Sequence, residues 1–192
     1  EYLENEGFPP LKIIGTNFEK NTIFMPANIS SQYISALLLI APKLQNGLIL
    51  TLEEEITSLP YIEMTLSLLN ELGVDTKFDG NEIIINTLQQ IKVKKITVES
   101  DWSSASYWYS VVALSNIGTK IVLSSYKKNS RQGDAILSEI YENFGVYTTF
   151  NSDESITISK VKSIEIQSFS YDLIKVPDIA QTIVVTCFGL KI

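Results

Sequence analysis

"LNELGVDTKFDGNEIII", residues Leu69–Ile85, returns in altered form as "YENFGVYTTFNSDESITI", residues Tyr141–Ile158. In both stretches a helical pattern ends at a glycine, and valine, a strand pattern, a polar turn and a second strand pattern follow. Gly73 and Gly145 are 72 positions apart, and glycine just past a helix suits the left-handed conformation that ends many helices. The chain is therefore predicted to contain a repeat of about 72 residues, with one supersecondary unit in each copy.

The same repeat extends upstream of these glycines. The stretch "SSQYISALLL", which begins at Ser30, pairs with "SSASYWYSVVAL", which begins at Ser103. Gly47 pairs with Gly118, and a strand pattern follows each of them. One unit therefore reads strand, helix, strand, helix, strand, strand. The predicted elements are Thr22–Met25, Ser30–Ala41, Leu48–Leu52, Pro60–Leu72, Thr76–Phe78 and Glu82–Asn86 in the first copy, and Lys95–Glu99, Ser103–Leu114, Lys120–Ser124, Gly133–Phe144, Tyr147–Phe150 and Ser155–Ser159 in the second.

The two helices of a unit differ in their apolar patterns. The first helix is apolar nearly all round, so it should be buried on most sides, whereas the second is amphipathic and should cover the outer face of a sheet. The stretch from Glu1 to Gly15 matches the tail of a unit, and the stretch from Val176 to Leu190 matches a head. These patterns predict an α/β (α+β) fold of repeated βαβαββ units, with two full units and a partial one at each end.

The partial units suggest a piece of a longer chain. They would leave unpaired strands and apolar faces, so the chain by itself is expected to self-associate, which sedimentation at high concentration would test.

Composition and charge limit the class of function. Hydrophobic residues make up 45% of the chain, which supports a substantial core. The formal charge of −7 argues against a general nucleic-acid binder, and no apolar run reaches the ~18 residues needed to cross a membrane. The single cysteine, Cys187, cannot form an intrachain disulfide, and no secretory leader opens the sequence. We therefore expect a cytoplasmic location.

One helix start carries more polar residues than a cap needs. The stretch "NISSQYISALLL", Asn28–Leu39, puts four polar residues in front of a nearly continuous apolar run. A single side-chain oxygen would satisfy one or two of the free N–H groups at the start of the helix. Hydroxyls and free N–H groups together could instead bind a phosphate or a carboxylate. Capping and anion binding both remain open from this stretch alone.

Six motifs in order carry a resemblance that covers essentially the whole chain: "EGFPPLKI", "SSQYISALLLIAP", "SLPYIEMTLSLL", "VESDWSSASYWYSVVAL", "NSRQGD" and "VPDIAQT". The sequence resembles the family of 3-phosphoshikimate 1-carboxyvinyltransferases, also called EPSP synthases. The resemblance implies an inside-out α/β barrel with helices inside and sheets outside. It also implies two domains, so residues 1–98 should belong to the first and residues 99–192 to the second.

The resemblance also implies a reaction and two substrates. The family transfers the enolpyruvyl group of phosphoenolpyruvate to the 5-hydroxyl of shikimate 3-phosphate by addition and elimination, with release of phosphate and with no metal or organic cofactor. It implies a monomer with small-molecule substrates, and no nucleic-acid or membrane partner. Ser30 and Ser31 are expected to donate hydrogen bonds to the 3-phosphate, and Gln32 is expected to reach toward both substrates.

Three further residues are implied by the same resemblance. Ser58 and Tyr61 in "SLPYIE" should be additional contacts to shikimate 3-phosphate, although Ser58 could simply cap the helix that begins near Pro60. Asp178 in "VPDIAQT" should accept a hydrogen bond from the substrate hydroxyl and help to move its proton. Its alternative role is that of an N-cap before an apolar helix.

Other polar helix starts are interpreted as structural. Asp101, Ser103 and Ser104 are expected to cap a helix, and "QGD" at residues 132–134 is expected to begin one. The sequence departs from the family pattern in three places, at Leu59, Ser100 and Trp102.

Cationic motifs of the family have no match in these 192 residues. The Lys-x-Ser-x-x-x-Arg opening, the arginine loop for phosphoenolpyruvate and the Lys-Glu-x-x-Arg segment are all missing, and there is no histidine. The chain by itself is therefore expected to be inactive. Two other function classes remain as alternatives: a non-catalytic binding or structural module with the same repeated unit, and a nucleotide- or RNA-end-processing enzyme, which would need a nucleophilic histidine.

Overall fold

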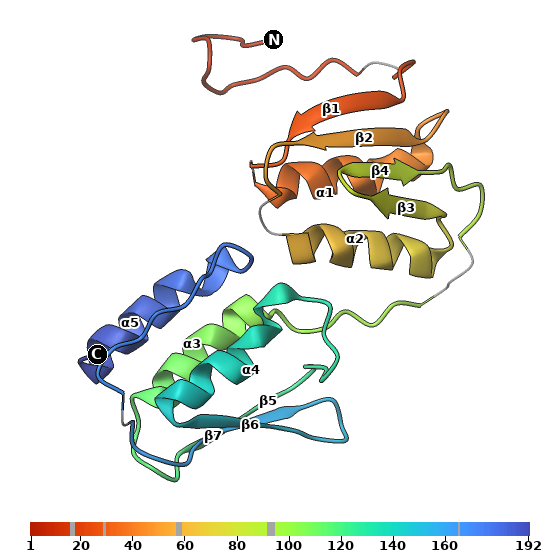
Figure 1. Ribbon diagram of the computed structural model, residues 1–192. Coiled ribbons are helices and arrows are strands. Elements are labelled where there is room, and N and C mark those ends of the chain that lie inside the picture. Colours follow the sequence, from red (N-terminus) through yellow and green to blue (C-terminus); the bar gives the residue numbers. More distant parts are fainter. Residues whose placement is uncertain (16–17, 29, 57–58, 92–94, 165) are drawn as a thin grey trace.

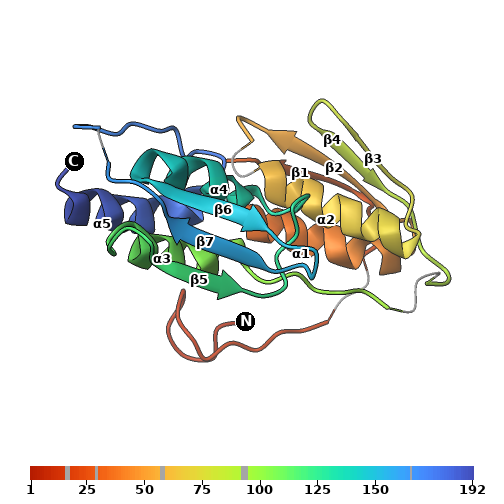
Figure 2. The same cartoon turned by 90° about the horizontal axis from the view of Figure 1, so that it is seen from below.

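Each full copy of the repeat forms its own sheet with helices packed against it (Figure 1). The structure is a computed structural model that describes residues 1–15, 18–28, 30–56, 59–91, 95–164 and 166–192. In Figures 1 and 2 the helices of the two units lie between the two sheets, so the sheets are on the outer sides. The α/β fold predicted from the repeat is confirmed.

The first unit follows the predicted order of elements. Strands β1 and β2 pair in parallel, and β4 pairs antiparallel with both β2 and β3, giving the order β1-β2-β4-β3. In β2 every second residue is buried, as expected for a strand with one face on a core. The elements are β1 (Thr22–Pro26), α1 (Ser31–Ile40), the 3-10 turn η1 (Ala41–Lys43), β2 (Leu48–Glu53), α2 (Leu59–Leu72), β3 (Thr76–Asp79) and β4 (Glu82–Ile85).

The second unit repeats this arrangement with one strand fewer. Its sheet has the order β5-β7-β6, and both pairings are antiparallel. The elements are α3 (Trp102–Ala113), β5 (Lys120–Leu123), η2 (Gly133–Ile136), α4 (Leu137–Ile140), η3 (Tyr141–Phe144), β6 (Val146–Phe150), β7 (Ile156–Lys160), η4 (Pro177–Ile179) and α5 (Ala180–Leu190).

The strand predicted at Lys95–Glu99 is wrong. Ile96 and Val98 are exposed there, so the segment has no core to pack against. One ladder-like bond remains, from Ser100 N to Ser125 O at 2.7 Å, at the position where the first unit has the bond from Ala27 N to Glu53 O. The segment leads from the first unit to the second (Figure 1), and this crossing takes it away from the edge of the second sheet.

The single helix predicted at Gly133–Phe144 is also wrong in detail. The segment forms two 3-10 turns, η2 and η3, around the short helix α4. Its buried residues are Asp134, Leu137, Ile140, Tyr141 and Phe144, so the segment keeps one buried side although its winding changes. 3-10 turns are frequent at the ends of α-helices, and here one lies on each side of α4.

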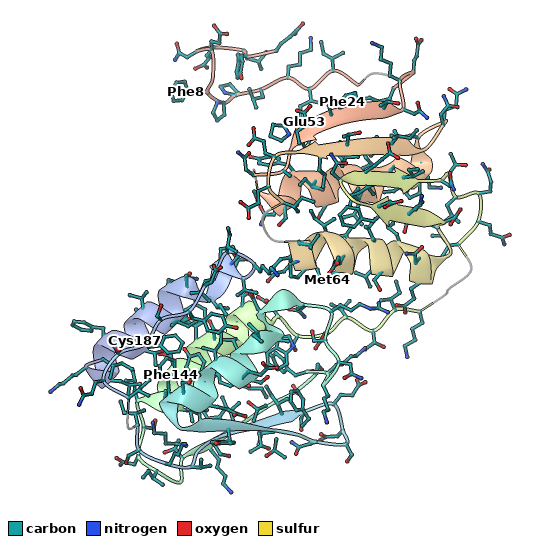
Figure 3. All side chains as sticks on the ribbon, viewed as in Figure 1. Phe8, Phe24, Glu53, Met64, Phe144 and Cys187 are labelled. Atoms are coloured by element: carbon teal, nitrogen blue, oxygen red, sulfur yellow. The ribbon has the colours of Figure 1, made fainter. Side chains whose placement is uncertain are left out.

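Two separate cores stabilise the two units. The first contains α1, α2 and the inner face of the first sheet, and the second contains α3, α4, α5 and the inner face of the second sheet. Phe144 is fully buried in the second core, whereas Phe24 projects from β1 and is largely exposed (Figure 3). Within the described ranges, no helix is both long and apolar enough to cross a membrane.

Helix α1 is less buried than its sequence predicts. Ile34 and Leu38 are fully buried, but Tyr33, Leu39 and Ile40 are exposed. The buried residues therefore lie on only one side of α1, toward α2 and the core of the first unit. The amphipathic pattern predicted for α2 is confirmed, since its buried residues are Ile62, Thr65, Leu66 and Leu69. Its predicted place on the outer face of a sheet is wrong, because these residues share the core of the first unit with α1.

The ends of the chain are less regular than the two full units. The amino-terminal stretch, predicted as the tail of a unit, forms one isolated antiparallel bridge between Tyr2 and Leu11. At the other end, η4 and α5 provide the helical part of the predicted head.

Candidate functional site

The start of α1 combines a cap with accessible donors. Ser30 is the N-cap, and its Oγ accepts a hydrogen bond from Gln32 N at a long 3.3 Å. Ser30 and Gln32 are exposed, and Ser31 is half-buried in the first turn. No acidic side chain occupies this turn, so an anion can meet its hydroxyls and those N–H groups that are not already bonded to Ser30. The capping and anion-binding interpretations are therefore compatible at this helix start.

The start of α2 lies beside the start of α1. The two helices follow the parallel strands β1 and β2, so both begin at the same edge of the sheet. Thr65 Oγ1 donates to Ser35 Oγ at 3.1 Å, and these residues lie within the first two turns of their helices. Ser58, predicted as a substrate contact or a cap, lies outside the described residues.

Tyr61, in the first turn of α2, reaches across to the second unit. Its hydroxyl is buried, and among the described residues it has no hydrogen-bond partner of standard geometry. Burial raises the pKa of the Tyr61 phenol, and the neighbouring carboxylates of Asp134 and Asp178 raise it further. The preceding Pro60 packs on Gly133, where an added methyl group would lie only 2.9 Å from Pro60 Cβ. The beginning of α2 is therefore docked against η2.

Asp134 is the residue on the other side of this contact. Its side chain is fully buried, and its Oδ2 accepts a hydrogen bond from Ser103 Oγ at 2.5 Å. Its Oδ1 has no partner within the described part of the chain. Burial raises the pKa of this carboxyl group, although the nearby hydroxyls of Ser103 and Tyr61 oppose the shift.

The local pattern of residues 132–134 predicts only a helix start, and these residues do begin η2. The Asp134 side chain makes no capping bond there. The missed feature is its contact with Tyr61, and no local pattern signals it because the two residues belong to different units.

Asp178 lies near this pair but remains accessible. It is in the first turn of η4, directly after Pro177, and its residue is exposed. Ile179, rather than Asp178, is the N-cap of α5. In the described residues no hydrogen bond reaches the Asp178 carboxylate, so its predicted alternative as a helix cap is wrong. The carboxylate is free to accept a proton or a hydrogen bond from a ligand.

The cluster of Tyr61, Ser103, Asp134 and Asp178 is called the junction cluster below. The charges that act on its Tyr61 and Asp134 come from aspartates. Arg131, a nearby cation, is paired with Glu71 at 2.8 Å. Because a phosphate would be repelled by this acidic surrounding, the cluster needs cations from elsewhere to hold one.

A shallow hollow of about 330 Å³ lies away from these residues. It lies beside η3 and contains no residue predicted for the site, so the junction cluster is better defined by its side-chain chemistry than by a cavity. The lining residues are Glu139, Glu142, Asn143, Tyr147, Lys162, Ser163 and Ile166.

The chain was compared with known proteins through their sequences and structures. The family model described as EPSP synthase (3-phosphoshikimate 1-carboxyvinyltransferase) matches residues 1–190. The chain belongs to this family. A 3-phosphoshikimate 1-carboxyvinyltransferase of Bacteroides fragilis strain YCH46 is 42% identical over 192 residues, which are all of this chain and 46% of the relative. A protein of the same name from Vibrio atlanticus is 35% identical and matches all of this chain and 44% of its own length.

The chain thus spans less than half the length of these relatives. Among solved structures, EPSP synthase from Acinetobacter baumannii aligns with 97% of this chain and 43% of its own, with a TM-score of 0.63 and 21% identity. This similarity establishes a shared fold. The family predicted from the six ordered motifs is confirmed.

Proposed function

We propose that the start of α1, the junction cluster and their neighbours form the part of an enolpyruvyl transferase active site that binds shikimate 3-phosphate. The observation that carries the proposal is the junction cluster, where Tyr61 of the first unit lies near Asp178 of the second. Gly133 packs against both Pro60, which precedes Tyr61, and Val176, which lies two residues before Asp178. Tyr61 and Asp178 were both predicted as site residues from separate motifs. Their proximity supports one binding site formed by both units, whereas a module with independent helix caps would not need it.

The proposed chemistry assigns a role to each accessible group. Ser30, Ser31 and Gln32 donate hydrogen bonds to the ligand phosphate and carboxylate from the start of α1. Asp178 accepts the proton of the substrate 5-hydroxyl while that oxygen attacks C2 of phosphoenolpyruvate, and C3 takes up a proton from solvent to become a methyl group. Return of a methyl proton from C3 to solvent and loss of phosphate from C2 of the tetrahedral adduct then give the enolpyruvyl product. Tyr61 supports binding at the junction between the units.

The two-domain interpretation belongs to the same proposal. Separate hydrophobic cores in the two units support a boundary between residues 1–98 and residues 99–192. We propose that the whole protein closes these two parts on its substrates as a monomer in the cytoplasm. The cations needed to hold two anionic substrates would come from residues outside this segment.

A binding experiment distinguishes the enzyme from a non-catalytic module. In the full-length protein, titration with shikimate 3-phosphate should shift the amide signals of Ser31, Gln32 and Tyr61, and addition of phosphoenolpyruvate should release inorganic phosphate. Shikimate without the phosphate is the matched control and should bind more weakly, because it makes no charge-assisted contacts at α1. Unperturbed signals and no phosphate release would favour the module.

The isolated 192-residue chain is expected to show no measurable transferase activity. It carries a formal charge of −7, and the described charges that act on its junction cluster are acidic. An uncompensated negative field opposes binding of both anionic substrates. The measurement is phosphate release by the purified chain beside the full-length protein at equal concentration. Turnover by the isolated chain above a mock purification would contradict the expectation.

A further inference from the structure

We propose that Asp134 is a positioning residue that accepts a hydrogen bond from the Tyr61 hydroxyl and thereby holds the two units in register around the substrate. The inference rests on the proposed function, and it deepens that function by adding a residue that need not touch either substrate. It also gives a role to the Asp134 carboxylate, which sequence analysis assigned only to a helix start.

The geometry leaves one free acceptor and one free donor side by side. Ser103 occupies Oδ2 of Asp134, and Oδ1 has no partner in the described part of the chain. The Tyr61 hydroxyl is buried next to this carboxylate and also lacks a partner there. A buried polar atom without a hydrogen bond is costly, so a small rotation that pairs the two groups is favourable.

The pairing would join elements that no sheet connects. Tyr61 lies in the first turn of α2, Asp134 in η2, and Ser103 in the first turns of α3. The contact of Pro60 with Gly133 already fixes the distance between α2 and η2. A hydrogen bond from Tyr61 to Asp134 would also fix the orientation of α2 relative to η2. It would therefore determine how the hydrogen-bond donors of the first unit face Asp178 of the second unit.

The single proton of the Tyr61 hydroxyl distinguishes a positioning role of Asp134 from competition between Asp134 and the ligand for that proton. A phenol has one proton to donate, so Tyr61 cannot give the same proton to Asp134 and to a phosphate. With its proton directed at Asp134, the Tyr61 oxygen keeps its lone pairs for a hydroxyl of the ligand. Removing Asp134 should then weaken substrate binding, whereas a competing carboxylate would strengthen binding when it is removed.

A double-mutant cycle in the full-length protein tests the inference. Asp134→Ala is expected to weaken shikimate 3-phosphate binding about tenfold, the loss typical of one hydrogen bond to a charged acceptor. In the Tyr61→Phe background the same change should matter less than about twofold, because the bond is already absent. Asp134→Val also removes both acceptor oxygens and serves if Asp134→Ala does not fold.

A second readout does not depend on any ligand. With 13C-labelled tyrosine, the Tyr61 ring signal should titrate at lower pH in Asp134→Asn, because loss of the neighbouring charge lowers the pKa of the phenol. Asp101→Asn is the matched control. It removes a nearby charge at the N-cap of α3 and keeps a good capping residue, so the Tyr61 signal should not move.

Three outcomes would overturn the role of Asp134. These are tighter binding in Asp134→Ala, an equal loss of affinity in both Tyr61 backgrounds, or an unchanged Tyr61 titration in Asp134→Asn. Failure of the unsubstituted protein to bind shikimate 3-phosphate would instead refute the proposed function. In that case the Tyr61 titration would still decide whether the two side chains are paired.

Discussion

Asp178→Asn is expected to lower the kcat of the full-length protein by about 10²- to 10⁴-fold, the usual contribution of a general base. Asparagine has nearly the same shape but cannot take up the proton of the attacking hydroxyl. The structure predicts little effect on folding, because Asp178 is exposed and is not the N-cap of α5. The measurement is the rate of phosphate release at saturating substrates, with the thermal unfolding midpoint measured in parallel.

Asp172→Asn provides the matched control for this prediction. Asp172 is another exposed aspartate that precedes α5, and its Oδ1 accepts a hydrogen bond from Ile174 N at 3.0 Å. Asparagine can make the same bond, so kcat should stay within about twofold. If Asp178→Asn retained a third or more of the original kcat, Asp178 would not be the base.

Gly145→Ala is expected to have the largest effect on stability. Gly145 ends η3 with φ +74°, and a methyl group there would lie 2.2 Å from the carbonyl oxygen of Lys162. The left-handed conformation alone costs an alanine about 1–2 kcal/mol. Relief of the overlap would require the backbone near β7 to move, so we expect a total loss of at least about 3 kcal/mol in the free energy of unfolding.

Gly118→Ala separates backbone conformation from steric overlap. Gly118 also has a positive φ, at +95°, but no atom lies within 4 Å of an added methyl group. This variant should therefore lose only about 1–2 kcal/mol. The two variants can be compared by urea unfolding followed by circular dichroism. Equal losses in both would show that contact with Lys162 does not matter.

The repeat made most of the architecture predictable. Strand and helix periods are local, and the glycines Gly73 and Gly145 mark the same helix end in both copies. The predicted strand at Lys95–Glu99 was wrong although its local pattern was sound, because a strand also needs a neighbour and a core. Ile96 and Val98 face solvent on the crossing between the units.

In the candidate site, too, some features were predictable from neighbouring residues in the sequence and others were decided only by the structure. The polar start of α1 was visible in "NISSQYISALLL", since a cap and its donors are adjacent in the chain. The N-cap role considered for Asp178 was also a local prediction, and the structure excluded it because α5 begins at Ala180, after Ile179. Because α5 begins after Ile179, the Asp178 side chain does not cap this helix, and its carboxylate stays available to a ligand.

The sequence by itself determined the repeated unit, most of its elements and the family to which the chain belongs, because these depend on local patterns and their spacing. Only the tertiary structure decided that Tyr61 of the first unit lies beside Asp134 of the second, with Asp178 nearby. The physical reason is that this contact depends on how two separate cores pack against each other. No periodicity within either unit encodes that packing.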